Sequence, residues 1–98
     1  MTAHYQLRDD DGHILDLELF KFDSCPFCIR VMSVVRDLDV QVRLRDTRRE
    51  DGARDELIKR GGKSQVPCLF IDGQALYEST DIIAFLQSRQ RVSDALPS

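Results

Sequence analysis

Two of the three cysteines in this 98-residue chain stand close together, in the stretch "DSCPFCIRV" (residues 23–31). Cys25 and Cys28 flank a proline, and a helical spacing of apolar residues begins at Pro26. Proline is favoured at the first position of a helix, because an N–H group there would have no partner in any case. We therefore expect Cys25 to meet the free backbone amides and the positive dipole end of a helix, which both stabilise a thiolate.

This arrangement predicts thiol-disulfide exchange. A thiolate on Cys25 would be the nucleophile, and Cys28, one helical turn later, would attack a mixed disulfide formed on Cys25. We expect Cys25 to be exposed and Cys28 to be more covered. Zinc binding is one alternative, but zinc takes four ligands, there is no second Cys-x-x-Cys pair, and Cys68 could add only a third ligand. Two chance core cysteines are the other alternative, which Pro26 disfavours.

The composition indicates an ordinary single globular domain. The chain is 42% hydrophobic and 32% charged, with a net charge of -3 and charges of both signs interspersed, so we expect no basic face for nucleic acid. No apolar run approaches the ~20 residues of a transmembrane helix, and the polar start is unlike a secretory signal. Three cysteines do not form a disulfide framework. We therefore expect a cytoplasmic protein that binds neither nucleic acid nor membranes.

Hydrophobic periodicity predicts the elements around the cysteine pair. Alternation predicts a strand from Leu15 to Phe22, and apolar residues at three- and four-residue steps predict a helix from Pro26 to Leu38. Val40 to Leu44 predicts a second strand, which would complete a βαβ unit. The expected inward face of the helix comprises Phe27, Val31, Val34, Val35 and Leu38.

The second half of the chain predicts a helix, a hairpin and a last helix. Residues 50–60 form a weaker helix that Gly61-Gly62 would end. Residues 68–71 and 74–77 predict two strands joined by an Asp72-Gly73 turn, and residues 82–86 predict the last helix. The apolar residues expected inside the two helices are Ala53, Leu57 and Ile58, followed by Ile82, Phe85 and Leu86.

The two ends carry weaker signals. Residues 1–13 form an N-terminal extension, in which residues 5–7 either add an edge strand or are disordered. Residues 14–89 form the organised domain, and residues 90–98 predict a flexible tail. His4 and His13 are expected to be free surface histidines rather than metal ligands. Cys68 is expected to be a small buried side chain.

These motifs resemble those of glutaredoxins, within the thioredoxin-like superfamily, from about residue 15 to residue 87. "SCPFC" resembles their Cys-Pro-Tyr-Cys active site, and "RGGKSQVPCLFIDG" resembles the loop, cis-proline and strand that follow their second helix. The resemblance implies a three-layer α/β domain, with a mixed four-stranded sheet, three helices and a possible extra N-terminal strand. It also implies a cis Val66–Pro67 bond, with the Val66 backbone free to pair with glutathione as a short added strand would.

The sequence departs from the glutaredoxin pattern at two places, and the second of them resembles the N-terminal domain of glutathione S-transferases instead. Phe22 stands where glutaredoxins commonly carry a lysine or arginine, three residues before the first cysteine. "YESTDI" replaces a double glycine and an acidic pair, and Gln65 before Val-Pro points the same way. By this resemblance Glu78 and Ser79 lie at the start of the last helix. There Ser79 and the free amides would hold the γ-glutamyl carboxylate of glutathione, and Ser79 would also cap the helix.

The expected function is a glutathione-dependent thiol-disulfide oxidoreductase with Cys25 and Cys28 as catalytic residues. Its expected partners are glutathione, as co-substrate, and glutathionylated or disulfide-containing proteins, with no metal and no permanently bound cofactor. The expected glutathione-binding residues are Phe27, Lys63, Gln65, Val66, Pro67, Glu78 and Ser79.

Some choices stay open at this point. Lys63 is preferred for the glycine carboxylate of glutathione, ahead of Lys21 and Arg60, and the run "RLRDTRRED" is expected to be a solvated face. The alternatives to the oxidoreductase are an iron–sulfur cluster carrier or sensor, formed by two chains through Cys25 and glutathione, and a non-catalytic glutathione-binding domain.

Overall fold

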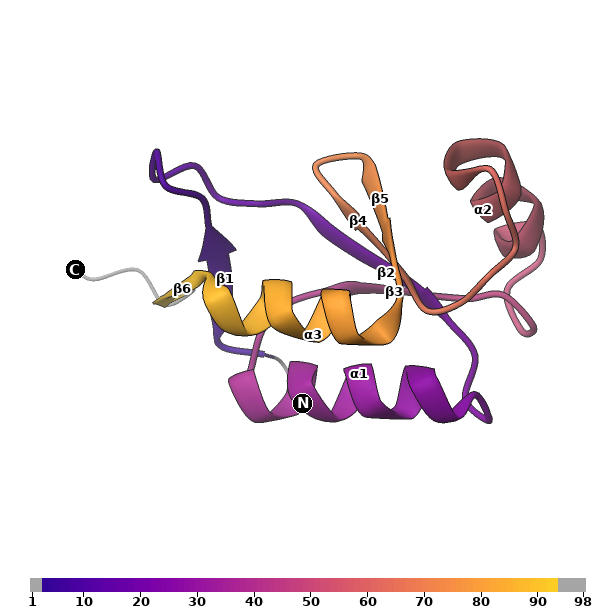
Figure 1. The fold of residues 1–98 in the computed structure, drawn as a ribbon, viewed down its shortest axis with the longest axis horizontal. Coiled ribbons are helices and arrows are strands. Elements are labelled where there is room, and N and C mark those ends of the chain that lie inside the picture. Colours follow the sequence, from indigo (N-terminus) through magenta and orange to yellow (C-terminus); the bar gives the residue numbers. More distant parts are fainter. Residues whose placement is uncertain (1–2, 94–98) are drawn as a thin grey trace.

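Six strands and three helices make up the part of the chain that a computed structural model describes, residues 3–93 (Figure 1). In chain order they are β1 (Tyr5–Arg8), β2 (Leu17–Lys21), α1 (Pro26–Leu38), β3 (Arg43–Asp46), α2 (Ala53–Gly61), β4 (Cys68–Ile71), β5 (Gln74–Tyr77), α3 (Ser79–Ser88) and β6 (Gln90–Ser93). The predicted order of elements is therefore confirmed. No helix within these residues is long and apolar enough to cross a membrane.

The central sheet has four strands in the order β3-β2-β4-β5. β2 runs parallel to β3 and antiparallel to β4, and β4 runs antiparallel to β5, so the sheet is mixed, as predicted. β2 is buried on both faces, because Leu17 and Leu19 pack on one side while Glu18 and Phe20 lie on the other. α1 and α3 cover the first face and α2 covers the second, which gives three layers (Figure 1).

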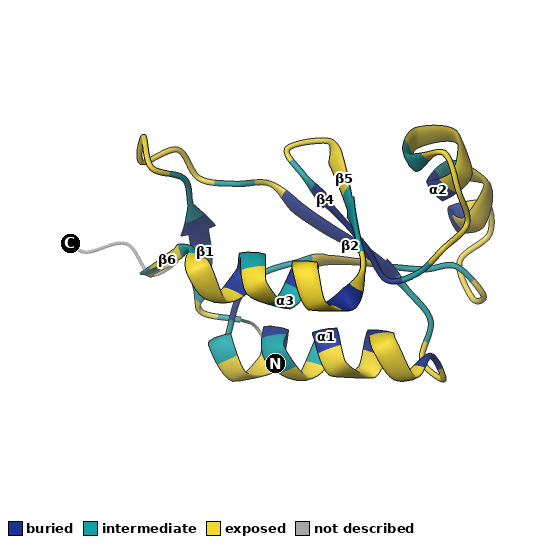
Figure 2. Cartoon of the chain, in the orientation of Figure 1, coloured by how far each residue is buried: buried dark blue, intermediate teal, exposed yellow. Residues whose placement is uncertain are grey.

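α1 has the predicted bounds but a different inward face. Cys28, Val31 and Val35 follow one another at three- and four-residue steps and are the buried residues of the helix (Figure 2). The predicted inward position of Phe27 is wrong, because Cys28 takes the inward place in the first turn and leaves Phe27 57% exposed.

β3 and α2 begin at other residues than the sequence predicts. β3 begins at Arg43 rather than Val40, because the backbone around Val40 pairs with β1: the N–H of Tyr5 donates to the Asp39 carbonyl and the N–H of Gln41 donates to the Tyr5 carbonyl. α2 begins at residue 53 rather than 50 and leaves Ile58 exposed.

The β4–β5 hairpin turns as the sequence predicts. Asp72 and Gly73 have φ angles of 49° and 87°, and two successive left-handed residues are what a two-residue type I′ turn requires.

The two ends of the described chain pair with each other. β1 and β6 form an antiparallel two-stranded sheet, with Tyr5 opposite Ser93 and Arg8 opposite Gln90. Leu7 of β1 is fully buried in the core that α1 and α3 share with the central sheet. The possible extra N-terminal strand is thus confirmed, whereas the flexible tail is wrong for residues 90–93; residues 94–98 lie outside the described residues.

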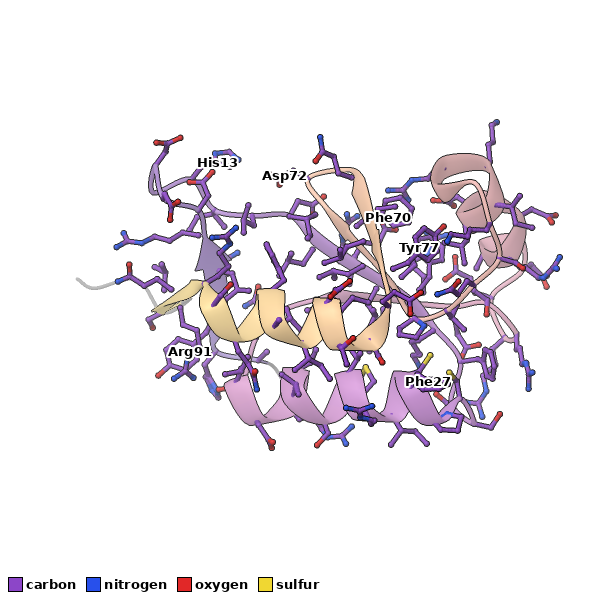
Figure 3. The ribbon with its side chains drawn as sticks, in the orientation of Figure 1. His13, Phe27, Phe70, Asp72, Tyr77 and Arg91 are labelled. Carbon is purple, nitrogen blue, oxygen red and sulfur yellow. The ribbon has the colours of Figure 1, made fainter. Side chains whose placement is uncertain are left out.

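Both histidines have carboxylate partners, so the prediction that they are free is wrong. His4 Nδ1 lies 2.5 Å from Asp39 Oδ2, and His13 Nε2 lies 3.7 Å from Asp72 Oδ2 at the tip of the β4–β5 hairpin (Figure 3). Within residues 3–93 there is no cluster of three or more histidine, cysteine, aspartate or glutamate side chains that could hold a metal ion.

α2 is attached to the sheet by a buried ion cluster. Glu18, only 4% exposed, accepts hydrogen bonds from Arg45 Nη1 (2.6 Å) and Arg60 Nη1 (3.0 Å), and both arginines also donate to Glu56 of α2. Both guanidinium groups lie over the Phe20 ring. Burial alone would raise the pKa of Glu18, but the two arginine hydrogen bonds outweigh it and lower that pKa. The predicted solvated face is therefore wrong at Arg45.

Replacing Glu18 by glutamine is expected to lower the free energy of unfolding at neutral pH by roughly 1–3 kcal/mol, because charge-assisted hydrogen bonds are lost and two arginines stay partly buried. A carboxylate with a lowered folded-state pKa stabilises the fold above its unfolded pKa. The difference between variant and wild type should therefore shrink as the pH falls below the ordinary glutamate value of 4.5.

Urea denaturation at neutral and acidic pH measures this difference. Glu50→Gln is the control, since the Glu50 side chain is 41% exposed and should contribute less than about 1 kcal/mol. An equal loss for Glu18→Gln at both pH values would contradict a role for its charge.

Candidate active site

One end of the central sheet gathers the segments that carry the predicted site residues. The loop with Cys25 follows β2, the segment ending in Pro67 precedes β4, and Glu78 follows β5. Because β4 is antiparallel to both β2 and β5, these three segments leave the sheet at the same end. β3 is parallel to β2, so the loop after β3 reaches this end as well.

Cys25 is the N-cap residue of α1. Its sulfur accepts a hydrogen bond from the backbone N–H of Cys28 at 3.3 Å, and its carbonyl accepts one from the N–H of Ile29 at 2.9 Å. Pro26 occupies the first helical position, as predicted. The Cys28 amide, which points at the Cys25 sulfur, and the dipole of α1 both stabilise negative charge on that sulfur.

The two cysteines differ in environment. Cys25 is 6% exposed and Cys28 is 1% exposed, so the prediction of an exposed Cys25 is wrong, although Cys28 is the more covered of the two. Burial, together with a hydrogen bond to Cys25, raises the pKa of Cys28 to about 12. Burial also raises the pKa of Cys68 to about 11, and Cys68 is fully buried, as predicted. Neither Cys28 nor Cys68 is therefore a thiolate at neutral pH.

The Val66–Pro67 peptide bond is cis, as the resemblance implied. On the neighbouring segment Glu78 has a φ of 71°, a left-handed value that residues with a side chain seldom adopt. Glu78 is the N-cap residue of α3, and its carbonyl accepts from the N–H of Ile82 at 3.0 Å.

Ser79 therefore begins α3 rather than capping it, and the predicted capping role is wrong. Ser79 is nearly buried, at 8% exposed, in the first turn of α3. Gln65 Nε2 donates to Glu78 Oε1 at 3.3 Å, which links the segment before the cis-proline to the start of α3. The structure thus brings Gln65, Glu78 and Ser79 together at one edge of the site.

Of the three cations considered for glutathione, only Lys63 has no carboxylate partner within the described residues. Its Nζ lies 4.6 Å from the centroid of the Tyr77 ring. Lys21 is paired with Asp23 at 2.7 Å, and Arg60 is held by the glutamates of the ion cluster. The geometry therefore favours Lys63, the preferred choice from the sequence.

Residues 19–93 match a family described as "Glutathione S-transferase, N-terminal domain". The chain belongs to this family. It is 29% identical over 69 residues to glutaredoxin 3 of Escherichia coli (strain K12), a match that covers 70% of this chain and 83% of that protein.

Solved structures show that this family member has a thioredoxin-like fold. A mutant of the thioredoxin-like protein BC3987 matches with a TM-score of 0.65 and 20% identity, covering 74% of this chain and 100% of that one. The holo form of glutaredoxin C1 from Populus tremula x tremuloides matches with a TM-score of 0.60 and 18% identity, covering 72% and 73%. The predicted thioredoxin-like fold is confirmed, and so is the predicted resemblance to glutaredoxins and to the transferase N-terminal domain. The similarity to glutaredoxin 3 supports thiol-disulfide oxidoreductase activity.

Arg48 is the site residue that the sequence analysis missed. Its guanidinium lies 3.7 Å from the centroid of the Phe22 ring, and its Nη1 donates to Ser24 Oγ at 3.4 Å. In this glutaredoxin-like domain Phe22 occupies the position where glutaredoxins commonly carry a cation, so a cation from the loop after β3 lies over that position instead. The sequence contains two signals for this contact, the unusual Phe22 and the arginine-rich run after residue 42. Only the parallel pairing of β2 with β3 shows that the two lie next to each other.

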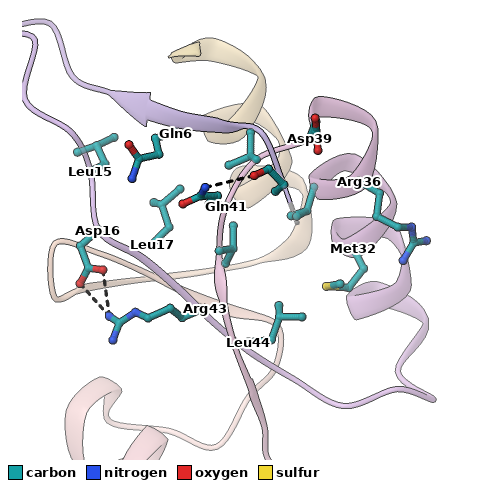
Figure 4. Close-up of a pocket in the computed structure, with 14 residues that line it drawn as sticks. Gln6, Leu15, Asp16, Leu17, Met32, Arg36, Asp39, Gln41, Arg43 and Leu44 are labelled. Carbon is teal, nitrogen blue, oxygen red and sulfur yellow. Dashed lines mark hydrogen bonds and ion pairs between the residues drawn. The ribbon is translucent and has the colours of Figure 1, made fainter. Parts of the chain in front are cut away.

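The exposed side chain of Phe27 lies at the N-terminal end of α1, next to Cys28 in the sequence (Figure 3). A cavity of about 720 Å³ lies elsewhere, between α1, residues 15–17 and residues 39–44 (Figure 4). Its lining includes neither Cys25, Cys28 nor Pro67, and no other cysteine. The candidate active site of this family member is therefore the cysteine end of the sheet.

Iodoacetamide at neutral pH is expected to modify Cys25 well before Cys28 or Cys68 in the folded protein. The pKa of Cys28 is raised to about 12, so its thiolate fraction stays small until the pH approaches that value, and its alkylation rate should climb steadily as the pH rises. Mass spectrometry of the tryptic peptides measures the modification of each cysteine. Equal rates at Cys25 and Cys28 at neutral pH would contradict this assignment of the nucleophile.

Proposed function

We propose that this protein is a glutathione-dependent thiol-disulfide oxidoreductase that reduces protein–glutathione mixed disulfides and protein disulfides through its Cys-Pro-Phe-Cys site. One observation carries the proposal: at the start of α1 the Cys28 amide points at the Cys25 sulfur, 3.3 Å away. An amide and a helix dipole aimed at one sulfur favour the thiolate that attacks disulfides. Kinship with glutaredoxins supports the same chemistry.

The Cys25 thiolate attacks the glutathione sulfur of a mixed disulfide. The S–S bond to the substrate breaks, the substrate leaves as a thiolate that takes up a proton, and Cys25 carries glutathione. A second glutathione thiolate then attacks the bound glutathione sulfur, which releases oxidised glutathione and the Cys25 thiolate. With a protein disulfide, the Cys25 thiolate attacks one substrate sulfur, the substrate S–S bond breaks, and the other substrate sulfur leaves as a thiolate. Cys28 then loses its proton and attacks the Cys25 sulfur, which breaks the bond between Cys25 and the substrate and releases the second substrate thiolate. Two glutathione molecules reduce the Cys25–Cys28 disulfide and leave as oxidised glutathione.

Glutathione would lie across the cysteine end of the sheet. The Val66 backbone beside Pro67 would pair with it as a short added strand, and Phe27 would flank its cysteine. The γ-glutamyl carboxylate would bind at the start of α3, where Ser79 and the first amides face an anion favourably.

The glycine carboxylate of glutathione needs a cation, and two are suitably placed. Lys63 and Arg48 each place their charged group over an aromatic ring of the site, and neither charged group is paired with a carboxylate within the described residues. Gln65 is held by Glu78 beside them. The three free cysteine thiols of the described chain fit a reducing compartment, and we infer a cytoplasmic location.

Cys25→Ser is expected to reduce glutathione-coupled turnover of a small glutathione mixed disulfide to background, because serine supplies no thiolate. Cys28→Ser should keep this activity within about threefold of wild type, since the one-cysteine route does not use Cys28. The coupled assay follows NADPH consumption by added glutathione reductase.

Cys68→Ala serves as the control, because Cys68 is buried on the other face of the sheet and should leave turnover within about twofold of wild type. Activity that survives in Cys25→Ser would refute the proposed nucleophile, and loss of all activity in Cys28→Ser would refute the one-cysteine route.

Lys63→Gln and Arg48→Gln are each expected to raise KM for the glutathione mixed disulfide by about three- to tenfold with little change in kcat, since each removes a charge that binds substrate without taking part in bond exchange. Lys59→Gln, on the exposed surface of α2, is the control and should change neither constant. If KM stayed at the wild-type value in both variants, these cations would not bind glutathione.

A further inference from the structure

Tyr77 lies next to the candidate active site. It is the last residue of β5, directly before Glu78, and it pairs in register with Cys68, the residue after the cis-proline. Its hydroxyl donates a hydrogen bond to the backbone carbonyl of Lys63 at 3.1 Å. Tyr77 thus connects β5, β4 and the segment that carries Lys63 at the candidate active site.

The contact with Lys63 involves both ends of that residue. The tyrosine hydroxyl holds the Lys63 carbonyl, while the Lys63 ammonium lies over the tyrosine ring, 4.6 Å from its centroid. A cation over an aromatic face gains favourable electrostatic energy. Tyr77 therefore fixes the backbone of Lys63 and the position of its charge at the same time.

Gly61 provides the space for this contact. A Cβ atom at Gly61 would lie 2.2 Å from the Tyr77 hydroxyl oxygen, far inside normal contact distance, and 3.2 Å from Tyr77 Cζ, which is a tight contact. The tyrosine hydroxyl therefore occupies the volume that a side chain at Gly61 would fill. Figure 3 shows Tyr77 beside Phe70, on the side of the sheet that faces α2.

The segment that Tyr77 contacts has no regular structure of its own. Residues 62–67 form neither helix nor strand, although they connect α2 to β4 and include Lys63, Gln65 and Val66. Burial raises the pKa of Tyr77, so the hydroxyl keeps its proton and remains a donor throughout the neutral range. A loop without its own ladder of backbone hydrogen bonds depends on such side-chain anchors for its conformation.

We propose that Tyr77 is a positioning residue for the glutathione site, which fixes the 62–67 loop through the Lys63 carbonyl and ammonium and thereby sets the affinity for the glutathione part of the substrate. This inference rests on the proposed function. Tyr77 acts through Lys63 and the loop, and takes no part in bond exchange at Cys25.

Tyr77→Phe tests the proposal, because it removes only the hydroxyl and keeps the ring in the core. We expect KM for a small glutathione mixed disulfide to rise about two- to tenfold, the effect of one hydrogen bond, with kcat within about twofold of wild type. Amide hydrogen exchange in residues 62–66 should become faster. Tyr5→Phe is the matched control, since Tyr5 lies in β1, at the opposite end of the molecule from the cysteines, and should change neither KM nor this exchange (Figure 1).

Gly61→Ala provides a second, independent variant. It places a methyl group where the tyrosine hydroxyl lies, so it should raise KM about as much as Tyr77→Phe does. In the double variant the space is already free, and KM should stay close to that of Tyr77→Phe alone rather than show the product of the two effects. If the rise in KM of the double variant equalled the product of the two single effects, the methyl group at position 61 and the Tyr77 hydroxyl would not compete for one volume. That result would overturn this part of the inference.

An unchanged KM in Tyr77→Phe, with an active wild type, would overturn the positioning role. A fall in kcat equal to the loss in kcat/KM would also overturn it, because Tyr77 would then act on bond exchange. A wild type without Cys25-dependent activity would refute the proposed function instead. In that case hydrogen exchange decides on Tyr77 alone: faster exchange in residues 62–66 supports the anchor, and unchanged exchange refutes it.

Discussion

Backbone pairing on both edges of β2 sets the position of every segment in the candidate site. β2 is the only strand of the central sheet with a parallel neighbour on one edge and an antiparallel neighbour on the other. The parallel neighbour brings the Arg48 loop to the end of the sheet where Cys25 lies, and the antiparallel neighbours bring the cis-proline and the start of α3. A register shift by one residue would turn Phe20 and Leu19 to the wrong faces and separate these segments.

The two faces of β2 are stabilised by different kinds of interaction. On the side of α1 and α3 the contacts are almost entirely apolar, with Leu7, Leu19 and Val31 fully buried. On the side of α2 a buried glutamate and two arginines share the space with aromatic rings. α2 contributes little apolar surface to the core, because its buried residues are Ala53 and Leu57. The ion pairs are directional, so they hold this helix in one orientation. The loop that Tyr77 anchors leaves from this charged side, directly after α2.

The sequence predicted most of the fold because its local signals agree with one another. Period-3.6 spacing placed α1 at residues 26–38, Asp72-Gly73 placed the hairpin, and Gly62 ended α2 in a left-handed conformation. It also placed Cys25 at a helix start, because proline marks the first turn. Features that depend on distant contacts were missed. The sequence of β6 carries no strand pattern of its own, and the strand forms by pairing with β1. Arg48 contacts Phe22 because the parallel pairing of β2 with β3 brings the ends of these two strands together. The burial of Glu18 likewise depends on arginines 27 and 42 residues away.

The pairing of β1 with β6 ties residue 5 to residue 93, a contact that spans nearly the whole described chain. Such a contact closes the longest loop available, and its entropic cost is met only when most of the chain is already ordered. Because Leu7 in this pair is part of the main core, the ends cannot fray without uncovering that core. This pairing favours unfolding of residues 5–93 as one cooperative unit, and it disfavours proteolysis within the buried part of β1 before the domain opens.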